Sequence, residues 1–522
     1  MKPEIIKIFG SAGAGKTSRL ISILEELIKT KQYTPEQIGY ISYTKAAVNE
    51  VRERVFALGY TKEQVDNFRT LHSFCYRLLE LQPNMVMQHK NYQIFGAKAD
   101  IDFGAEYESK AEDLMEEEGI TEGGKFKALY AYEKNKLEQH PQLNKFFSDK
   151  RYAGIVKSFD EFKKLHGMFD FNDFITETLK RKIIPQIKVL FIDEVQDATN
   201  SMFRLWRFWL TAGNIEKCYM AGDDLQAIYM FLGADAKLFI DHEGEDVCLD
   251  KTYRLPPLIL DYSTKLFDRV KIKKDRKIIS ATQNGIGGLY NLNVTNLKRD
   301  PTNIINKLNT NDSTFVLFRH RKFCKNFMYR LMDSRIPFKN LHGLDPFSRY
   351  EFKALRGIHR LKTNSALSAE DLKSIVLFFP LPIAVKNAID VLPNDTQINT
   401  AYLKTLGITT DIISWLITNP YEALQFNIDK TRQWVGAYLY NCLNQNPQYY
   451  EQEPNIIVST IHGVKGKEAN NVFLVNSLNI NSYTTLEDDP DSEHKVFYVG
   501  ATRAKKNLYL VSTDDDYTYN LS

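Results

Sequence analysis

The sequence predicts an α/β protein built from two units of parallel strands and helices, each interrupted by a mainly helical segment. The first observation is an apolar strand, a glycine-rich loop and an amphipathic helix in succession over residues 5–28. The second is a continuous apolar run, 189–192, that ends in two carboxylates, as expected for a buried parallel strand. The third is another set of short apolar strands that begins at Phe315. A chain of 522 residues is also too long for a single core.

Composition limits the class of protein. Hydrophobic residues make up 43% and charged residues 25% of the chain, which is typical of a globular protein in water. The formal net charge of +3 permits nucleic-acid binding only if basic side chains are concentrated locally. The five cysteines are scattered without metal-ligand spacing, which indicates free thiols. Because the sequence shows neither a leader-like start nor an apolar run of spanning length, we expect a cytoplasmic protein without a membrane partner.

The first candidate site is the loop GSAGAGKT at residues 10–17. Its glycines allow backbone N–H groups to close around phosphate oxygens, and the following helix adds the positive end of its dipole. We expect Lys16 to reach the β- and γ-phosphates and Thr17 to ligate Mg²⁺. The alternative interpretation is a glycine-rich turn before an ordinary helix. The predicted nucleotide-binding residues of this stretch are Gly10, Ser11, Ala12, Gly13, Ala14, Gly15, Lys16, Thr17, Ser18 and Arg19.

The second candidate site is the pair of carboxylates that ends the apolar strand KVLFIDEVQD. Open α/β sheets bind ligands at the carboxyl ends of their strands, so this strand points both groups toward the phosphate loop. We expect Asp193 to hold Mg²⁺ and Glu194 to act as the general base that polarises the attacking water. Gln226, after a later strand, is a candidate sensor of the γ-phosphate, since its amide can bond both water and a phosphate oxygen.

Taken in order, the motifs of this chain resemble those of the UvrD/Rep/PcrA-like group of superfamily 1 helicases. The series is GSAGAGKT, SYTKAA, TLHS, FIDEVQD, GDDLQAIY, TYR, FRHR, STIHGVKGKE and FYVGATRA. The run FDFNDF at residues 169–174 is similar to a further family feature. The joint order is far more specific than any single motif.

The resemblance implies two RecA-like domains, 1A and 2A, with ATP in the cleft between them and single-stranded DNA across their tops. It also implies helical insertions, 1B and 2B. We expect 1A to comprise residues 1–78 and 169–250, 1B residues 79–168, 2A residues 251–344 and 455–522, and 2B residues 345–454.

The resemblance also implies roles for individual residues. Arg254 and Arg503 occupy the positions of the family's arginine fingers, and Tyr253 and Glu468 those of residues that contact adenine and ribose. The catalytic set is therefore Lys16, Glu194, Gln226, Arg254 and Arg503. The residues in DNA-contacting motifs are Tyr43, Thr44, Thr70, His72, Phe231, Arg319, Thr460 and His462. Tyr43 and Phe231 could stack on bases, with the alternative that both are core aromatics.

Some positions depart from the family pattern. Ser18 stands where the family usually has Arg, and Phe231-Leu232 where it has Trp-Arg. Only a few residues precede the first strand, so the family's adenine-reading glutamine segment is not found there. Both insertions are shorter than usual. These departures leave open the selectivity for ATP and the choice between translocation and strand separation.

The resemblance predicts an ATP-driven helicase that moves 3′-to-5′ on single-stranded DNA and unwinds duplex in replication, repair or recombination. The alternative is a DNA-stimulated ATPase sensor that partners a nuclease in repair or anti-phage defence and unwinds little. A third reading, a phosphate-loop kinase or other metabolic enzyme, does not explain the second set of motifs after Phe315. An RNA motor stays open as well, because backbone contacts need not detect the 2′-hydroxyl. Expected partners are single-stranded DNA, DNA with single-stranded tails, and a nuclease or a replication or repair protein. We expect a monomer or weak oligomer.

Overall fold

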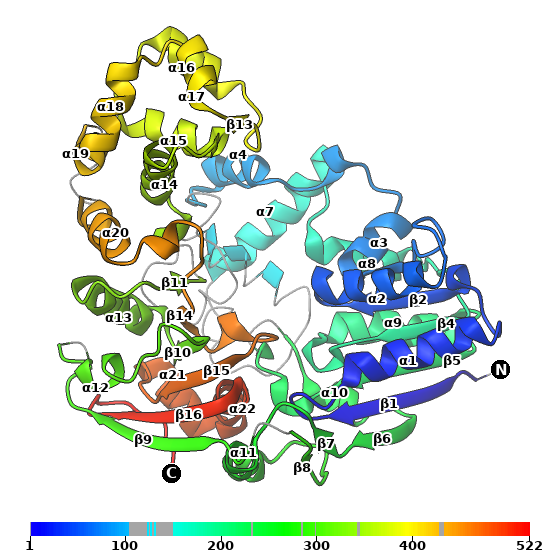
Figure 1. Ribbon diagram of the computed structural model, residues 1–522. Coiled ribbons are helices and arrows are strands. Elements are labelled where there is room, and N and C mark those ends of the chain that lie inside the picture. Colours follow the sequence, from blue (N-terminus) through cyan, green and yellow to red (C-terminus); the bar gives the residue numbers. More distant parts are fainter. Residues whose placement is uncertain are drawn as a thin grey trace. The chain divides into compact units, whose positions relative to one another are not determined.

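The chain forms two compact units, each of which contains segments distant in the sequence. Unit 1 comprises Met1–Leu289 and Leu478–Leu508, and unit 2 comprises Tyr290–Ser477 and Tyr509–Ser522. The computed structural model describes residues 2–103, 123–124, 126–127, 130–131, 150–230, 233–282, 285–297, 299–341, 345–426 and 433–522. Figure 1 shows their helices and strands.

Unit 1 contains a six-stranded sheet with the order β3-β2-β4-β5-β1-β6. Its strands are β1 (Glu4–Gly10), β2 (Ile38–Ser42), β3 (Phe68–Thr70), β4 (Val189–Ile192), β5 (Lys217–Gly222) and β6 (Glu245–Leu249). Every neighbouring pair in this sheet runs parallel. All four residues of β4 are buried, as its unbroken apolar sequence predicts for a central parallel strand.

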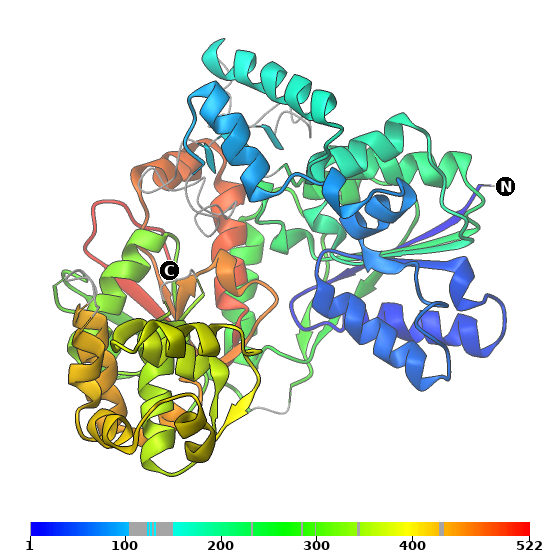
Figure 2. The same ribbon diagram turned by 90° about the horizontal axis from the view of Figure 1, so that it is seen from above.

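Helices cover both faces of this sheet, which Figure 2 shows nearly edge-on. They are α1 (Lys16–Lys29), α2 (Lys45–Ala57), α3 (Leu71–Leu78), α8 (Phe171–Lys180), α9 (Asn200–Ala212) and α10 (Ala236–Ile240). Unit 1 also contains α11 (Pro257–Arg269), α21 (Ile480–Asp488) and α22 (Pro490–Ala501), and α22 packs against both α11 and α21. Apolar side chains of α1 and α2 pack on one face of the sheet. Those of α3, α8, α9 and α10 pack on the other, so the core has three layers.

Helices α2 and α3, which follow β2 and β3, begin at threonine caps. Thr44 accepts a hydrogen bond from the N–H of Ala47 at the start of α2, and Thr70 does so from Ser73 at the start of α3. Such a hydroxyl satisfies one of the N–H groups that a helix leaves unpaired at its first turn. A 3-10 turn, η4 (Val195–Asp197), follows β4, and another, η5 (Asp224–Gln226), follows β5.

Helices α4 (His89–Ala99) and α7 (Lys150–His166) belong to the segment between α3 and α8. They share a small core that is mostly aromatic, with Phe95, Phe103, Phe126 and Phe159 at its centre. Phe95 and Phe159 meet edge-on with ring centroids 4.9 Å apart. This core is separate from the two that cover the sheet of unit 1.

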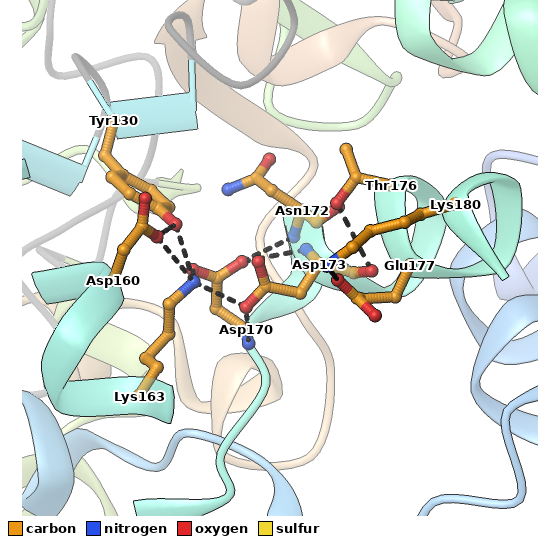
Figure 3. Close-up of polar contacts among 9 residues, drawn as sticks. All are labelled: Tyr130, Asp160, Lys163, Asp170, Asn172, Asp173, Thr176, Glu177 and Lys180. Carbon is orange, nitrogen blue, oxygen red and sulfur yellow. Dashed lines mark hydrogen bonds and ion pairs between the residues drawn. The ribbon is translucent and has the colours of Figure 1, made fainter. Parts of the chain in front are cut away.

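A buried lysine ties α7 to the start of α8. The amine of Lys163, on α7, lies 2.8 Å from Asp170 Oδ2 and also contacts Asp173 and the hydroxyl of Tyr130. Figure 3 shows the amine between these groups, while Lys180 pairs with Glu177 farther along α8. Burial lowers the pKa of Lys163, but the charges of Asp170 and Asp173 outweigh it and the pKa is raised. The lysine is therefore held in its charged form.

Unit 2 is organised around a second six-stranded sheet with the order β11-β14-β10-β15-β16-β9. Its strands are β9 (Gly288–Val294), β10 (Thr314–Phe318), β11 (Lys339–Asn340), β14 (Ile456–Thr460), β15 (Ala469–Val475) and β16 (Ala504–Thr513). Strand β10 runs parallel to β14 and β15, and β11 runs parallel to β14. Two parallel sheets of this kind confirm the predicted α/β class.

The helices of unit 2 share one apolar core with this sheet. They are α12 (Thr302–Ile305), α13 (Arg321–Asp333), α14 (Tyr350–Lys362), α15 (Ala369–Phe378), α16 (Ile383–Asp390), α17 (Thr400–Thr405), α18 (Thr410–Thr418), α19 (Pro420–Gln425) and α20 (Gln433–Gln445). Short strand pairs complete the two units: β7 (Lys251–Thr252) with β8 (Ile279–Ser280), and β12 (Leu367–Ser368) with β13 (Gln397–Ile398). No helix among the described residues has the length and apolar character that crossing a membrane requires.

We predict that Lys163→Met strongly destabilises unit 1, because it leaves two buried carboxylates without their cation. Breaking a buried pair in this way costs about 3–5 kcal/mol. The matched control is Lys180→Met, since the Lys180 side chain is 76% exposed and its pair with Glu177 contributes about 0.5 kcal/mol or less. Urea unfolding curves of both variants measure the difference. Equal midpoints would contradict the structural role given to Lys163.

Candidate active site

Three strands of unit 1 deliver polar residues to one edge of the sheet. β5 pairs in parallel with both β1 and β4, so the carboxyl ends of all three strands lie together. β1 leads into the glycine-rich loop, β4 into Asp193 and Glu194, and β5 into Asp223. This edge is where parallel sheets bind ligands.

The loop between β1 and α1 has the backbone geometry of an anion site. Gly13 and Gly15 have φ of 73° and 78°, which is the left-handed region that glycine adopts without strain. Helix α1 has neither a side-chain cap nor an acidic residue in its first turn, so its first N–H groups remain for a ligand. The amine of Lys16 turns back to the carbonyl oxygens of Gly10 and Ser11, at 3.0 and 3.3 Å.

An orphaned polar atom lies in the same loop. The hydroxyl of Ser11 is buried and has no hydrogen-bond partner. A buried hydroxyl left unpaired costs about 1–3 kcal/mol, so it favours a ligand oxygen that would accept from it. Ser18 and Arg19, by contrast, are exposed on α1. A phosphate group suits the loop, which offers Ser11, Lys16 and the helix N-terminus as donors.

The Thr17 hydroxyl and the Asp193 carboxylate meet beside the loop. Thr17 donates to Asp193 Oδ2 over 2.7 Å, and the buried Tyr40 hydroxyl donates to the same oxygen over 3.1 Å. Burial and the neighbouring charge of Glu194 raise the pKa of Asp193 to about 6. The Thr17 and Asp193 oxygens are the hard ligands that Mg²⁺ prefers, so these two residues would suit this ion. Among the described residues, no cluster of three or more His, Cys, Asp or Glu side chains offers another metal site.

Glu194 is held in an unusual conformation next to Asp193. Its φ of 58° and ψ of 38° place it in the left-handed region, which costs a residue with a side chain about 1–2 kcal/mol. Gln196 donates to its carboxylate, and the other end of the Gln196 amide accepts from the N–H of Asp223 over 3.0 Å. Gln196 thus orients the Glu194 carboxylate and links it to the turn after β5.

In that turn, the side chain of Gln226 lies between Asp223 and Arg503. Its amide nitrogen donates to Asp223 Oδ2 over 2.6 Å, and its amide oxygen accepts from Arg503 over 3.2 Å. Arg503 is only 1% exposed. Burial and the charge of Arg254 lower its pKa to about 9, which keeps the guanidinium charged at neutral pH. Gln226 is therefore in direct contact with one of the two predicted finger residues.

The TYR motif packs directly on the phosphate loop. The Thr252 hydroxyl donates to the carbonyl oxygen of Ala12 over 2.7 Å, and the Tyr253 N–H donates to that of Gly13 over 2.9 Å. The Tyr253 side chain is 64% exposed, which leaves its ring open to stack on a base. A Cβ at Gly13 would lie 2.4 Å from Arg254 Cβ, so the loop and the motif fit without space for a side chain.

The predicted DNA contacts of unit 1 have different environments. Thr44 is exposed at the N-cap of α2, and Thr70 is half-buried at that of α3. Burial lowers the pKa of the half-buried His72 to about 4, so its imidazole is neutral at physiological pH, and its ring meets the exposed Phe171 edge-on. Tyr43 packs on the core and its hydroxyl lies 2.8 Å from Met202 Sδ, which agrees with the core-aromatic alternative.

The remaining predicted contacts belong to unit 2, apart from Phe231, which lies outside the described residues. Arg319, Thr460 and His462 are each at most 5% exposed and follow the carboxyl ends of β10 and β14. These two strands pair in parallel, so the three residues lie at one edge of the second sheet. Glu468 is exposed just before β15.

Sequence reasoning missed three residues that hold the candidate site together. Tyr40 bonds Asp193, Gln196 bonds Glu194, and Arg276 pairs with Asp223. Gln196 stands inside the carboxylate motif, and that position was the only signal for it. Tyr40 and Arg276 reach their partners across 153 and 53 positions, which no local pattern reveals.

Two family models cover much of the chain in the order that the motifs predict. The UvrD/REP helicase N-terminal domain matches residues 3–245. The UvrD-like helicase C-terminal domain matches residues 439–515. The chain belongs to the UvrD/Rep helicase family. The first of these matches contains the phosphate loop and both carboxylates, and the second contains Arg503.

Named members of the UvrD/Rep family align over most of this chain at low identity. The ATP-dependent DNA helicase Rep of Buchnera aphidicola is 23% identical over 96% of this chain and 88% of its own length. The probable DNA helicase II homolog of Mycoplasma pneumoniae is 23% identical over 97% of this chain and 81% of that protein. The ATP-dependent DNA helicase PcrA of Staphylococcus aureus is 23% identical over 69% of this chain and 52% of PcrA.

We predict that Gly13→Ala destabilises this family member more than Gly15→Ala does. Both glycines have a positive φ, so each substitution carries a strain of about 1–2 kcal/mol. Only the Cβ at position 13 meets neighbouring atoms, whereas at position 15 nothing lies within 4 Å. The clash adds about 1–3 kcal/mol. Thermal unfolding without nucleotide measures the difference, and equal shifts would disprove the close packing of Arg254 on the loop.

Proposed function

We propose that this chain is an ATP-dependent DNA helicase that translocates 3′-to-5′ along single-stranded DNA. One observation carries the proposal: a phosphate loop, two carboxylates and an amide–arginine pair converge at one edge of the first sheet. Each part supplies something that hydrolysis of a triphosphate requires. We infer DNA as the substrate because the chain belongs to a family whose named relatives are DNA helicases. We infer the direction of movement from the motif resemblance.

Hydrolysis needs a water molecule activated close to the γ-phosphate. Glu194 is the proposed base, because its half-buried carboxylate follows the strand next to the loop and is oriented by Gln196. Lys16 neutralises charge on the β- and γ-phosphates. Its present partners are carbonyl oxygens, which phosphate oxygens can replace at little cost. Gln226 then contacts the γ-phosphate or the attacking water.

Negative charge that shifts among phosphate oxygens during cleavage needs nearby cations. Arg503 contacts Gln226, and Arg254 follows the loop so closely that its Cβ leaves no room for a side chain at Gly13. Because the charge of Arg254 also acts on Arg503, we assign both guanidinium groups to this site within unit 1. A planar guanidinium can donate to two phosphate oxygens at once. We propose that both act mainly in the transition state and contribute less to the affinity for ATP.

Mg²⁺ is the proposed second cofactor. Thr17 and Asp193 would hold it, since their oxygens already meet at 2.7 Å. When bound, the ion would neutralise phosphate charge, as it does in other phosphate-loop enzymes. Burial and the charge of Glu194 raise the pKa of Asp193, and a bound cation would favour its charged form.

The proposed DNA contacts use backbone recognition. Thr44 and Thr70 in unit 1, and Arg319 and Thr460 in unit 2, are of the types that grip phosphates without reading sequence. Each group lies at the carboxyl edge of its own sheet. We further propose that residues 79–168 and 345–454 correspond to the 1B and 2B insertions.

Substitution of Lys16 and Glu194 tests the proposed function. Lys16→Ala is expected to lower DNA-stimulated ATP hydrolysis by about 100-fold or more, with single-stranded DNA binding retained. Glu194→Gln is expected to lower turnover by about 100-fold or more while ATP still binds, because the amide cannot accept the proton. Hydrolysis is measured by phosphate release, and unwinding by separation of a labelled duplex with a 3′ tail.

The matched control is Glu25→Gln, which changes a carboxylate of the same helix as Lys16 that pairs only with Lys29 on the surface. It should leave turnover unchanged. If Glu194→Gln hydrolysed ATP at the parental rate, Glu194 would not be the general base. Hydrolysis by the parent without separation of 3′-tailed or 5′-tailed duplex would favour the ATPase sensor instead. Absence of any DNA-stimulated hydrolysis would disprove the proposed function.

The apparent affinity for Mg²⁺ should weaken as the pH falls through about 6. Because the pKa of Asp193 is raised, the carboxyl is protonated and neutral below this value, and a proton then competes with the metal. The expected loss is about tenfold per pH unit below that point. Turnover titrated with Mg²⁺ at fixed ATP, from pH 7.5 to 5, measures it. A constant affinity over this range would exclude Asp193 as a ligand.

A further inference from the structure

Arg276 is a fully buried cation beside the candidate site that the hydrolysis scheme does not use. It lies in the segment between α11 and β8, and its side chain is 0% exposed. A guanidinium removed from water in this way is stable only if carboxylates compensate its charge. Its partners are Asp223 and Asp224, both also fully buried, at the turn after β5.

The guanidinium bridges these two carboxylates with separate nitrogens. One nitrogen lies 2.7 Å from Asp223 Oδ1 and the other 2.5 Å from Asp224 Oδ1. The second nitrogen also donates to the carbonyl oxygen of Lys274, whose own N–H donates to Asp224 Oδ2 over 2.8 Å. Arg276 and its segment are therefore fixed to the turn by side-chain and backbone bonds together.

The bridge continues to Arg503 through Gln226. Asp223 uses one oxygen for Arg276 and the other for the Gln226 amide, which in turn accepts from Arg503. Two cations are thus connected through an aspartate and a neutral amide. Rotation of Asp223 away from Gln226 would release the amide that Arg503 contacts.

The charges that act on Arg503 show what Arg276 does. Asp223 and Asp224 share the guanidinium of Arg276 at 2.7 and 2.5 Å. Burial and the charge of Arg254 lower the pKa of Arg503, whereas the charges of Asp223 and Glu194 raise it. Without Arg276, the buried charge of Asp223 would lose its own cation and would act more strongly on Arg503.

We propose that Arg276 is a positioning residue for hydrolysis: it neutralises Asp223, which keeps the Asp223 charge from drawing Arg503 toward itself, and it holds Gln226 toward Arg503 through Asp223. This inference rests on the proposed function. A purely structural role for Arg276 is the competing explanation. The two explanations predict changes in different kinetic constants. They also differ in whether removal of the Asp223 charge restores kcat.

Steady-state ATP hydrolysis by the full chain with saturating oligo(dT) tests the proposal. Arg276→Gln is expected to lower kcat by about 10–100-fold while KM for ATP changes by less than about threefold, because finger charges act in the transition state. Arg276→Lys keeps the charge and should retain kcat within about threefold. An unchanged kcat in Arg276→Gln, or equal losses in both variants, overturns the proposal.

A double-mutant cycle with Asp223→Asn separates the effect of the Asp223 charge from a structural effect of losing Arg276. The amide still accepts from Gln226 but carries no charge, so Arg276→Gln should cost less than about threefold in kcat in the Asp223→Asn background. A further tenfold loss in the double variant overturns the proposal. The double variant still leaves the buried Asp224 without Arg276, so Asp224→Asn is added to it if Arg276→Gln alone does not fold. The kcat of Asp223→Asn/Asp224→Asn with and without Arg276→Gln then decides the question, and a tenfold difference overturns the proposal.

Arg356→Gln is the matched control. Arg356 pairs with the fully buried Asp371 of unit 2, which keeps Arg360 as a second partner, and no role in hydrolysis is assigned to it. Its kcat should stay within about twofold of the parent, and melting temperatures of all variants report destabilisation. Lys16→Ala distinguishes the two proposals. If Lys16→Ala hydrolyses ATP as fast as the parent, or if neither hydrolyses ATP, the proposed function fails. If Arg276→Gln hydrolyses ATP at the parental rate, only the role of Arg276 is disproved.

Discussion

The candidate site depends on the parallel pairing of β5 with both β1 and β4. In parallel strands the side chains after the carboxyl ends gather at one edge, so three short apolar runs carry the loop, Asp193 and Asp223 to the same place. A shift of one position in any of these strands would turn each of its side chains to the opposite face of the sheet. The fully buried strand β4 therefore fixes the position of Asp193 and Glu194 as well as contributing to the core.

Burial at this edge raises the energetic cost of every charge, and the side chains there are paired accordingly. Asp193 accepts from Thr17 and Tyr40, and the two aspartates after β5 share Arg276. Low dielectric strengthens such pairs, and it penalises any charge that loses its partner. The charges of Asp223 and Asp224 are thus balanced by Arg276, whereas the Thr17 and Tyr40 partners of Asp193 are neutral hydroxyls, so a cation that arrives with a triphosphate would find its counter-charge there.

The sequence predicts the parts of the site that are contiguous, and it does not predict the contacts that support them. The loop at residues 10–17 and the carboxylates at 193 and 194 could be identified because each is one short motif after a strand. Strands β6 and β9 could not, since their polar, partly exposed sequences lack the apolar run of a central strand. Arg276 was also missed, because one basic residue among several gives no sign of partners 52 and 53 positions away.

The strained backbone at Glu194 explains why Gln196 belongs to this motif. A left-handed conformation at a residue with a side chain persists only where surrounding contacts hold it. Gln196 supplies them at both ends of one amide, to the Glu194 carboxylate and to the backbone of Asp223. The turn after β4 is thus tied to the turn after β5, so a movement of Asp223 would reach Glu194 as well as Gln226. Through these bonds Glu194, the proposed base, and Gln226, the proposed γ-phosphate sensor, form one connected unit, and Arg276 anchors its far end.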